Sequence, residues 1–221
     1  VMLRHDWEMN DKITLTTSGS YQFGFNGSTA LDWYDARDPR PDYYRRLPSF
    51  IEDPEASMRV AERLSANPEL LQIDWANMYN VNRKSFATIE NVDGIDGNDV
   101  SGLRAKYIIE DRHYDSKEFN FNSVLQAEVN QNLTINGGLL YQMYQGDYYK
   151  EVEDLLGADF YVDIDRFVER DIPNDPNALQ NDLNRPNRLL REGDRFGYDY
   201  DPQIRRGEVW GQAAFTYRTL D

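Results

Sequence analysis

Apolar and polar side chains alternate along segment 119–143, on both sides of a short polar turn. The even positions carry mostly Asn, Gln, Glu and Thr, whereas the odd positions carry apolar residues. These apolar residues are Phe119, Phe121, Leu125, Ala127, Val129, Leu133, Ile135, Leu139, Tyr141 and Met143. Because successive side chains of a strand point to opposite faces, the pattern predicts two antiparallel strands, at about 118–130 and 133–146. The hairpin that they form has one apolar face and one polar face.

Three further segments alternate in the same way, which predicts strands at about 1–9, 12–26 and 207–219. The second of these is the most regular, because its even positions from Thr14 to Gly24 are all small or polar. We therefore expect an all-β fold of antiparallel strands, with residues 1–221 belonging to one domain.

Two long connections separate these strands, at about 27–117 and 147–206, and both are rich in Asp, Asn, Tyr and Pro. Within the first connection, Asp53 and Pro54 form an N-cap followed by proline at the first helical position, which predicts a helix over 56–65.

Two more elements are expected in the first connection. A second short helix is predicted to begin near Pro68 and to carry Leu70, Leu71 and Trp75. A strand is predicted over 103–110, before the strongly polar stretch that precedes the hairpin.

The connections alternate in length, since short turns and long loops follow one another along the chain. Outer-membrane β-barrels have this asymmetry, with short periplasmic turns and long extracellular loops, and they carry aromatic residues at both membrane interfaces. We therefore expect part of a larger transmembrane barrel, with odd residues facing lipid and even residues facing the lumen, because open strand edges would leave backbone groups unpaired in hydrocarbon. A soluble β-sandwich is the alternative, since a polar face also suits bulk solvent.

Composition limits the function classes. The 39 acidic and 24 basic residues give a net charge of -15, which argues against nucleic acid as a partner. There is no cysteine, so disulfides, thiolate metal sites and cysteine nucleophiles are excluded. No run of about 18 apolar residues occurs, and residues 1–10 lack the pattern of a signal peptide.

Four segments resemble TonB-dependent outer-membrane receptors of Bacteroidetes-type bacteria. They are LDWYDARDPRPDYYRRLPSF (31–50), QIDWANMYNVN (72–82), GLLYQMYQGDYYKEVEDLLGADFYVDIDRF (138–167) and GYDYDPQIRRGEVWGQAAFTY (197–217). The resemblance implies a middle portion of a large barrel in the cell outer membrane, with two extracellular loops, that helps to import a saccharide, a peptide or a metal chelate. Its expected partners are outer-membrane lipid, lipopolysaccharide, a surface lipoprotein and TonB, which would act through a plug domain absent from this chain.

Aromatic and charged side chains are densest in the first connection. The residues that we predict to contact a ligand are Trp33, Tyr34, Asp35, Tyr43, Tyr44, Trp75 and Tyr79. Aromatic faces beside hydrogen-bonding groups suit a sugar, a peptide or a chelate. The alternative is that these aromatic residues only pack the loop onto its neighbours.

Calcium is the one cofactor for which the sequence offers candidate ligands. Asp93, Asp96 and Asp99 recur every three residues, with glycines between them. An EF-hand requires a different spacing, so a glycine-rich turn is the alternative interpretation. The acidic residues of 151–165 are expected to form a solvated face, or to bind lipopolysaccharide through divalent cations.

The sequence offers few candidate catalytic residues, because His5 and His113 are the only histidines and no phosphate-binding loop occurs. We therefore expect a transport component and not an enzyme. Two other classes stay open. One is a soluble, secreted, β-rich carbohydrate-binding or glycoside-active module, which detergent dependence would distinguish. The other is a structural adhesin, which would need neither a ligand nor TonB.

Overall fold

Antiparallel β-sheet dominates the computed structural model, in which 51% of the chain is strand, and this confirms the all-β fold class. The structure describes residues 1–172, 174–175 and 177–217. Contacts divide the chain into two units. Unit 1 contains Val1–Gly27, His113–Tyr148 and the described residues from Tyr200 onward, and unit 2 contains Ser28–Arg112 and Tyr149–Asp199.

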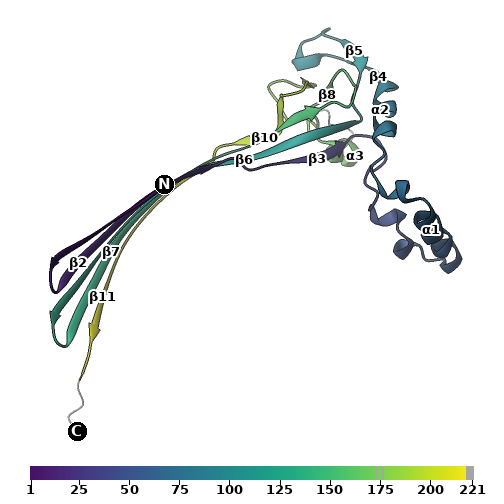
Figure 1. Ribbon diagram of the computed structural model, residues 1–221. Helices are drawn as coiled ribbons and strands as arrows, with labels where there is room; N and C mark the ends of the chain where they lie inside the picture. The colour runs from purple at the N-terminus through teal and green to yellow at the C-terminus, as the bar shows by residue number, and fades with distance from the viewer. Residues whose placement is uncertain (173, 176, 218–221) are drawn as a thin grey trace. The chain divides into compact units, whose positions relative to one another are not determined.

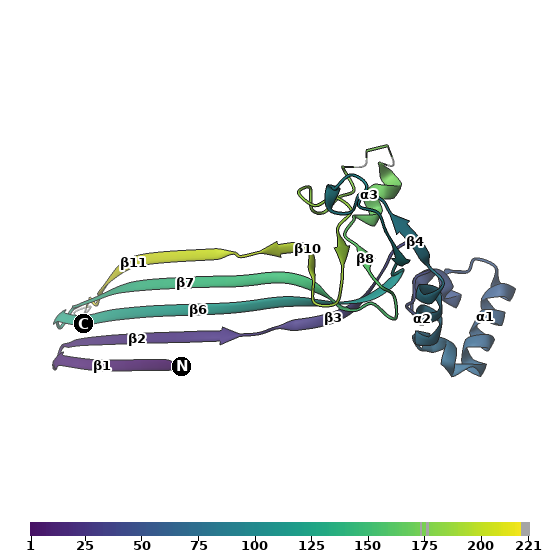
Figure 2. The same ribbon diagram turned by 90° about the horizontal axis from the view of Figure 1, so that it is seen from above.

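Unit 1 is an open antiparallel sheet (Figures 1 and 2). Strand β1 pairs with β2, β2 with β6, β6 with β7, and β7 with β11. The bounds are β1 Met2–Asn10, β2 Ile13–Gly24, β6 Tyr107–Asn130, β7 Leu133–Asp154 and β11 Gln203–Phe215. The long strands β6 and β7 also contribute their remaining residues to unit 2.

The pairing register places the apolar residues of neighbouring strands on one face. Leu15 is paired with Trp7 on one side and with Leu125 on the other, and Val209 is paired with Leu139. Directly paired residues of antiparallel strands point to the same face. The odd positions of β1, β2 and β6 therefore share one face, and so do the odd positions of β7 and β11.

The polar positions of β6 and β7 also meet on a common face. The side-chain amide of Gln142 donates to Glu118 Oε1 at 2.7 Å. The rings of Tyr114 and Tyr148 also contact each other, with 5.5 Å between their centroids. Both contacts join even positions, so the separation of polar from apolar positions continues across the β6–β7 pair.

The described residues of unit 1 form no hydrophobic core of their own. Among its described residues only Gly146 is buried, so no second layer covers the sheet. The large apolar side chains of the odd face are instead exposed. They are Leu3, Trp7, Tyr21, Phe23, Phe25, Leu125, Val129, Ile135, Leu139, Tyr141, Met143, Val209 and Phe215.

Two hairpin turns in unit 1 use the same local device. The Asn10 side chain accepts a hydrogen bond from the backbone N–H of Lys12 at 2.9 Å, and the Asn130 side chain accepts one from Asn132 at 2.9 Å. An asparagine that bonds the backbone two residues on closes a tight turn without help from a core. The short sequence of each turn therefore sets the position of its hairpin.

Unit 2 consists of shorter elements around a hydrophobic core. Its helices are η1 Tyr44–Arg46, η2 Pro48–Phe50, α1 Pro54–Ala66, η3 Pro68–Leu71, α2 Trp75–Arg83, η4 Val92–Gly94 and α3 Arg166–Asp171. Its strands are β3 Gly27–Trp33, β4 Phe86–Ile89, β5 Val100–Leu103, β8 Tyr161–Val162, β9 Leu189–Leu190 and β10 Arg195–Tyr200, of which the end residues Gly27 and Tyr200 fall in unit 1. One buried cluster surrounds Ile108, Val152 and Leu190, and a second joins Met78 to Tyr107 and Leu156.

The strand bounds differ from those expected from alternation. Strand β6 begins at Tyr107 and not near 118, and β7 ends at Asp154 and not near 146. Of the predicted strand 103–110, the second half, 107–110, is the start of β6, and Leu103 is the last residue of β5. The expected loops 27–117 and 147–206 accordingly contain paired strands. These strand parts carry polar residues on both faces, so they give no period-two signal although their backbones are paired.

The final strand, expected at 207–219, is β11 at Gln203–Phe215. Positions 218 and 219 of the expected strand lie outside the described residues.

The predicted helix after Asp53 is confirmed. The Asp53 side chain accepts from the backbone N–H groups of Glu55 at 2.9 Å and Ala56 at 3.4 Å, which caps α1. The second predicted helix is divided, because η3 ends at Leu71 and α2 starts at Trp75. In the described part of the chain, no helix is both long enough and apolar enough to cross a membrane.

Candidate ligand-binding groove

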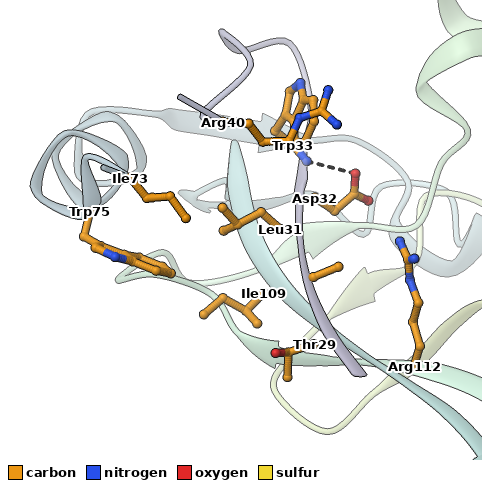
Figure 3. Close-up of a pocket in the computed structure, with 10 residues that line it drawn as sticks. Thr29, Leu31, Asp32, Trp33, Arg40, Ile73, Trp75, Ile109 and Arg112 are labelled. Atoms are coloured by element: carbon orange, nitrogen blue, oxygen red, sulfur yellow. Dashed lines mark hydrogen bonds between the residues drawn. The ribbon is translucent and has the colours of Figure 1, made fainter. Parts of the chain in front are cut away.

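A groove of about 610 Å³ lies within unit 2 (Figure 3). Its lining combines an apolar floor with charged groups at the rim. The lining residues are Thr29, Ala30, Leu31, Asp32, Trp33, Arg40, Ile73, Trp75, Ile109 and Arg112. They come from β3, from the loop after it, from the residue before the α2 cap (Ile73), from the first residue of α2 (Trp75) and from β6.

The apolar floor is held by the packing of α2. Ile73 and Trp75 approach Leu31 and Ile109 from the opposite side of the groove (Figure 3). Ile73, Leu31 and Ile109 also pack against the buried cluster of Met78. The Asp74 side chain caps α2 by accepting from the backbone N–H of Asn77 at 2.9 Å. The cap fixes where α2 begins and thereby positions Trp75, its first residue.

Trp33 and Arg40 form one part of the rim. The guanidinium carbon of Arg40 lies 5.2 Å from the centre of the Trp33 ring, which is a cation–π distance. Arg40 is also held by Asp38, with 2.6 Å between its Nη2 and a carboxylate oxygen. Asp32 accepts a hydrogen bond from the Trp33 backbone N–H at 2.9 Å. The indole and the guanidinium therefore have defined positions before any ligand binds.

Arg112, at another part of the rim, belongs to a buried charge cluster. Glu110 is 1% exposed and accepts from Arg112 Nε at 2.6 Å and from Lys150 Nζ at 2.9 Å. Lys150 also lies 4.2 Å from the centre of the Phe196 ring. The hydrogen bond to Glu110 therefore anchors the Arg112 guanidinium, and Arg112 lines the edge of the groove.

Two of the predicted ligand residues, Trp33 and Trp75, line this groove. Tyr34 and Asp35, the two predicted residues that follow Trp33, do not line it. Tyr34 is buried in the core, with the Arg104 guanidinium 4.0 Å from its ring centre. Asp35 pairs with Lys106 at 2.6 Å, and this hydrogen bond holds the pKa of the Asp35 carboxyl below its usual value.

The other predicted aromatic residues lie away from the groove lining. Tyr43 and Tyr44 contact each other edge to face, with 5.1 Å between ring centroids, and Tyr44 contacts Phe50 in the same way at 5.0 Å. Tyr79 packs beside the Met78 cluster and lies under the guanidinium of Arg83 at 5.6 Å. These contacts describe loop packing, so the structure brings together only the two tryptophans.

The aspartates considered for calcium form part of a turn. Asp99 accepts a hydrogen bond from the Asn91 backbone N–H at 3.0 Å, and Asp93 pairs with Arg185 at 3.0 Å. Gly94 and Gly97 have φ values of +70° and +74°, which glycine adopts readily. Within residues 1–172, 174–175 and 177–217, no group of three His, Asp or Glu side chains is arranged to hold a metal ion.

Of the ten residues that line the groove, only Trp33 and Trp75 were among the predicted ligand residues. Leu31, Ile73, Ile109 and Arg112 were not identified as site residues, although they line it. Ile109 and Arg112 follow Trp33 by more than seventy positions and reach the groove because β3 pairs with β6. No local pattern marks such residues, since the pairing of β3 with β6 is a tertiary relationship.

Comparison with known proteins gives no relative. No family model, no curated protein and no solved structure matches this chain.

Proposed function

We propose that this chain is part of a β-barrel transporter of the outer membrane, of the TonB-dependent type that its loop segments resemble. In this proposal the sheet of unit 1 crosses the membrane, with its odd face toward lipid and its even face toward the lumen. Unit 2 is the extracellular part, and its groove contacts the imported nutrient.

The uncovered apolar face of unit 1 is the observation that carries the proposal. In water, each large apolar side chain left exposed forgoes roughly 1.5–3 kcal/mol of burial free energy. Monomeric soluble proteins rarely expose apolar patches larger than a few hundred Å². A face formed by side chains such as Leu15, Leu125, Leu139 and Val209 on adjacent strands therefore needs a cover, and lipid chains supply one without a second protein layer.

Aromatic residues mark both ends of this face. Tyr21 is paired with Phe119 at the end remote from the hairpin turns, whereas Trp7 and Phe215 lie near the turns. Aliphatic residues such as Leu125 lie between the two groups. This order matches the aromatic girdles that border the apolar band of outer-membrane barrels.

The two edges of the sheet support a barrel that has more strands than the described structure contains. In the described structure β1 pairs only with β2, and β11 pairs only with β7. Unpaired backbone groups are costly in hydrocarbon, so each edge requires a neighbouring strand when the sheet lies in a membrane.

Depth-dependent quenching of tryptophan fluorescence tests the proposal. The native protein is prepared in two single-tryptophan forms in which the other tryptophans are Phe. One form retains Trp7 on the odd face, and the other retains Trp210 on the even face. In vesicles with brominated acyl chains, we expect Trp7 to be strongly quenched and Trp210 to keep its emission.

Two results would count against the proposal. Equal emission of the two forms with and without bromine would show that neither face contacts lipid. A protein that stays in solution without detergent would favour the soluble secreted module, in which the apolar face packs against another protein surface.

A further inference from the structure

We propose that the even face of unit 1 carries a binding site for a neutral saccharide, with the indole of Trp210 as its stacking platform. The site is separate from the groove of unit 2. The inference rests on the proposed function, because it takes the even face to line a water-filled lumen.

Trp210 lies on the backbone of the neighbouring strand. Trp210 and Gly138 are directly paired residues of β11 and β7. A Cβ atom added at Gly138 would overlap three ring atoms of Trp210, namely Cε2, Nε1 and Cζ2. The indole therefore covers the space that a side chain at position 138 would fill.

Contact with Gly138 uses one side of the indole and leaves part of the ring accessible. Trp210 is 37% exposed. A pyranose ring presents a face of C–H groups that packs on an aromatic ring, with its hydroxyl groups directed outward. The indole thus offers a flat apolar surface of the size of one sugar ring.

Polar side chains flank this platform along the even face, which also carries the apolar Leu140 opposite Glu208. Gln212 and Glu208 flank Trp210 on β11, and Gln212 is paired with Asn136 of β7. Residues two positions apart on a strand share a face about 7 Å apart, which is within reach of the hydroxyl groups of a stacked sugar. An aromatic face with amide and carboxylate groups beside it can bind a sugar ring through stacking and hydrogen bonds.

The basic residues of the even face are paired with acidic ones, which favours a neutral ligand. In the described part of unit 1, the basic residues at even strand positions are Arg4 and Arg206. Arg4 lies 3.0 Å from an Asp6 oxygen, and Arg206 lies 2.5 Å from a Glu208 oxygen. Both cations are thus compensated, so a phosphate or carboxylate would gain little there, whereas hydroxyl groups find amide and carboxylate partners.

Further polar and aromatic groups extend the site along β7. Glu118 accepts hydrogen bonds from Gln142 at 2.7 Å and from Asn120 at 2.9 Å. Beyond them the hydroxyl groups of Tyr144 and Tyr148 are bonded to each other. Several sugar units could therefore contact the face in succession, which favours an oligosaccharide.

Fluorescence titration of the single-tryptophan form that retains Trp210 tests this inference. Maltohexaose, cellohexaose and xylohexaose are the probes, and the form that retains Trp7 is the control. We expect at least one of these neutral oligosaccharides to change the emission of Trp210 saturably and to leave Trp7 unchanged. Replacing Gln212 with Ala in the Trp210 form should weaken that binding, and W210A in the otherwise native protein should weaken it at least about fivefold by calorimetry.

The outcomes separate this inference from the proposed function. If none of the three probes changes Trp210 while brominated lipid still quenches only Trp7, the saccharide site is wrong and the barrel orientation stands. If brominated lipid quenches Trp210, the even face does not line a lumen and both proposals fail. Equal effects on Trp210 and Trp7 would indicate a solvent effect and would also overturn the saccharide site.

Discussion

The side-chain amide of Asn82 is hydrogen-bonded to both backbone polar groups of Tyr107. Its Oδ1 accepts from the Tyr107 N–H at 3.0 Å, and its Nδ2 donates to the Tyr107 carbonyl at 2.8 Å. The same Nδ2 also donates to the Leu155 carbonyl at 2.9 Å. Asn82 is fully buried. Through its side chain, α2 supplies hydrogen-bond partners for buried backbone groups at the start of β6 and just after the end of β7.

Asn82→Ala should therefore favour local unfolding of this part of unit 2. Several buried backbone groups would lose their partners, at about 3 kcal/mol in total. The Lys106 N–H also donates to Asn82 Oδ1, at 2.8 Å. We therefore expect the amide hydrogens of Lys106 and Tyr107 to exchange about 100-fold faster in the variant than in the native protein, as measured by hydrogen exchange. Asn80→Ala, at an exposed position of the same helix, is the control. Similar exchange in both variants would contradict the assigned role of Asn82.

Gly138 should not tolerate a side chain while Trp210 is present. Gly138→Ala forces the indole from its position, and overpacking of this kind costs about 1–3 kcal/mol. Gly137→Ala is a close control, because its Cβ would meet only the Trp210 carbonyl oxygen at 3.6 Å. The free energies of unfolding of the two single variants, Gly138→Ala and Trp210→Ala, and of the double variant give the coupling energy between the two positions. Additive effects of the two substitutions would refute the contact.

Neighbouring positions 125 and 126 should respond in opposite ways to a charge. Leu125 lies on the odd face, whereas Gln126 lies on the even face. With the odd face in lipid, Leu125→Arg should cost about 2–4 kcal/mol of folding free energy, and Gln126→Arg should cost much less. Urea unfolding of the two variants in vesicles measures this difference. Equal tolerance at both positions is not compatible with a lipid-facing odd face.

Trp75→Ala should lower nutrient uptake more than the paired change Tyr43→Ala with Tyr44→Ala. Trp75 lines the groove, whereas Tyr43 packs on Tyr44, which in turn packs on Phe50. Removal of an aromatic contact from a binding site costs more than about 1 kcal/mol, or about fivefold in affinity. The measurement is nutrient uptake by cells that grow on mixed nutrients. Met58→Ala on exposed α1 is the control, and a stronger effect of the tyrosine change would place the site elsewhere.

Asp163 should make the stability of unit 2 depend on pH. It is 2% exposed, and burial raises the pKa of its carboxyl, although Asn181 donates to it at 2.9 Å and Arg188 lies 3.6 Å away. A raised pKa means that the folded state holds the proton more tightly than the unfolded state. The stability contributed by Asp163 is therefore largest below the unfolded pKa of about 3.9, and is lost as pH rises through the folded pKa.

Thermal melting of the native protein and Asp163→Asn from about pH 4 upward checks this dependence. We expect the melting temperature of the native protein to fall relative to that of the variant as pH rises. Glu62→Gln, at an exposed position of α1, serves as the control. A constant difference between the native protein and Asp163→Asn over that range would exclude the effect.

The sequence by itself determined the strands with one apolar face. Successive side chains of a strand point to opposite faces, so alternating apolar and polar residues show such a strand directly. It also determined the capped start of α1 at Asp53 and the hairpin turns, since these depend on hydrogen bonds between residues close in sequence.

Only the tertiary structure decided which residues form the groove and which aromatic residues are core. Tyr34 and Trp33 are neighbours in sequence, yet the first is buried and the second lines the groove. Ile109 and Arg112 reach the same groove through the pairing of β3 with β6. The polar ends of β6 and β7 were likewise missed, because strand pairing there satisfies backbone groups without an apolar face to signal it.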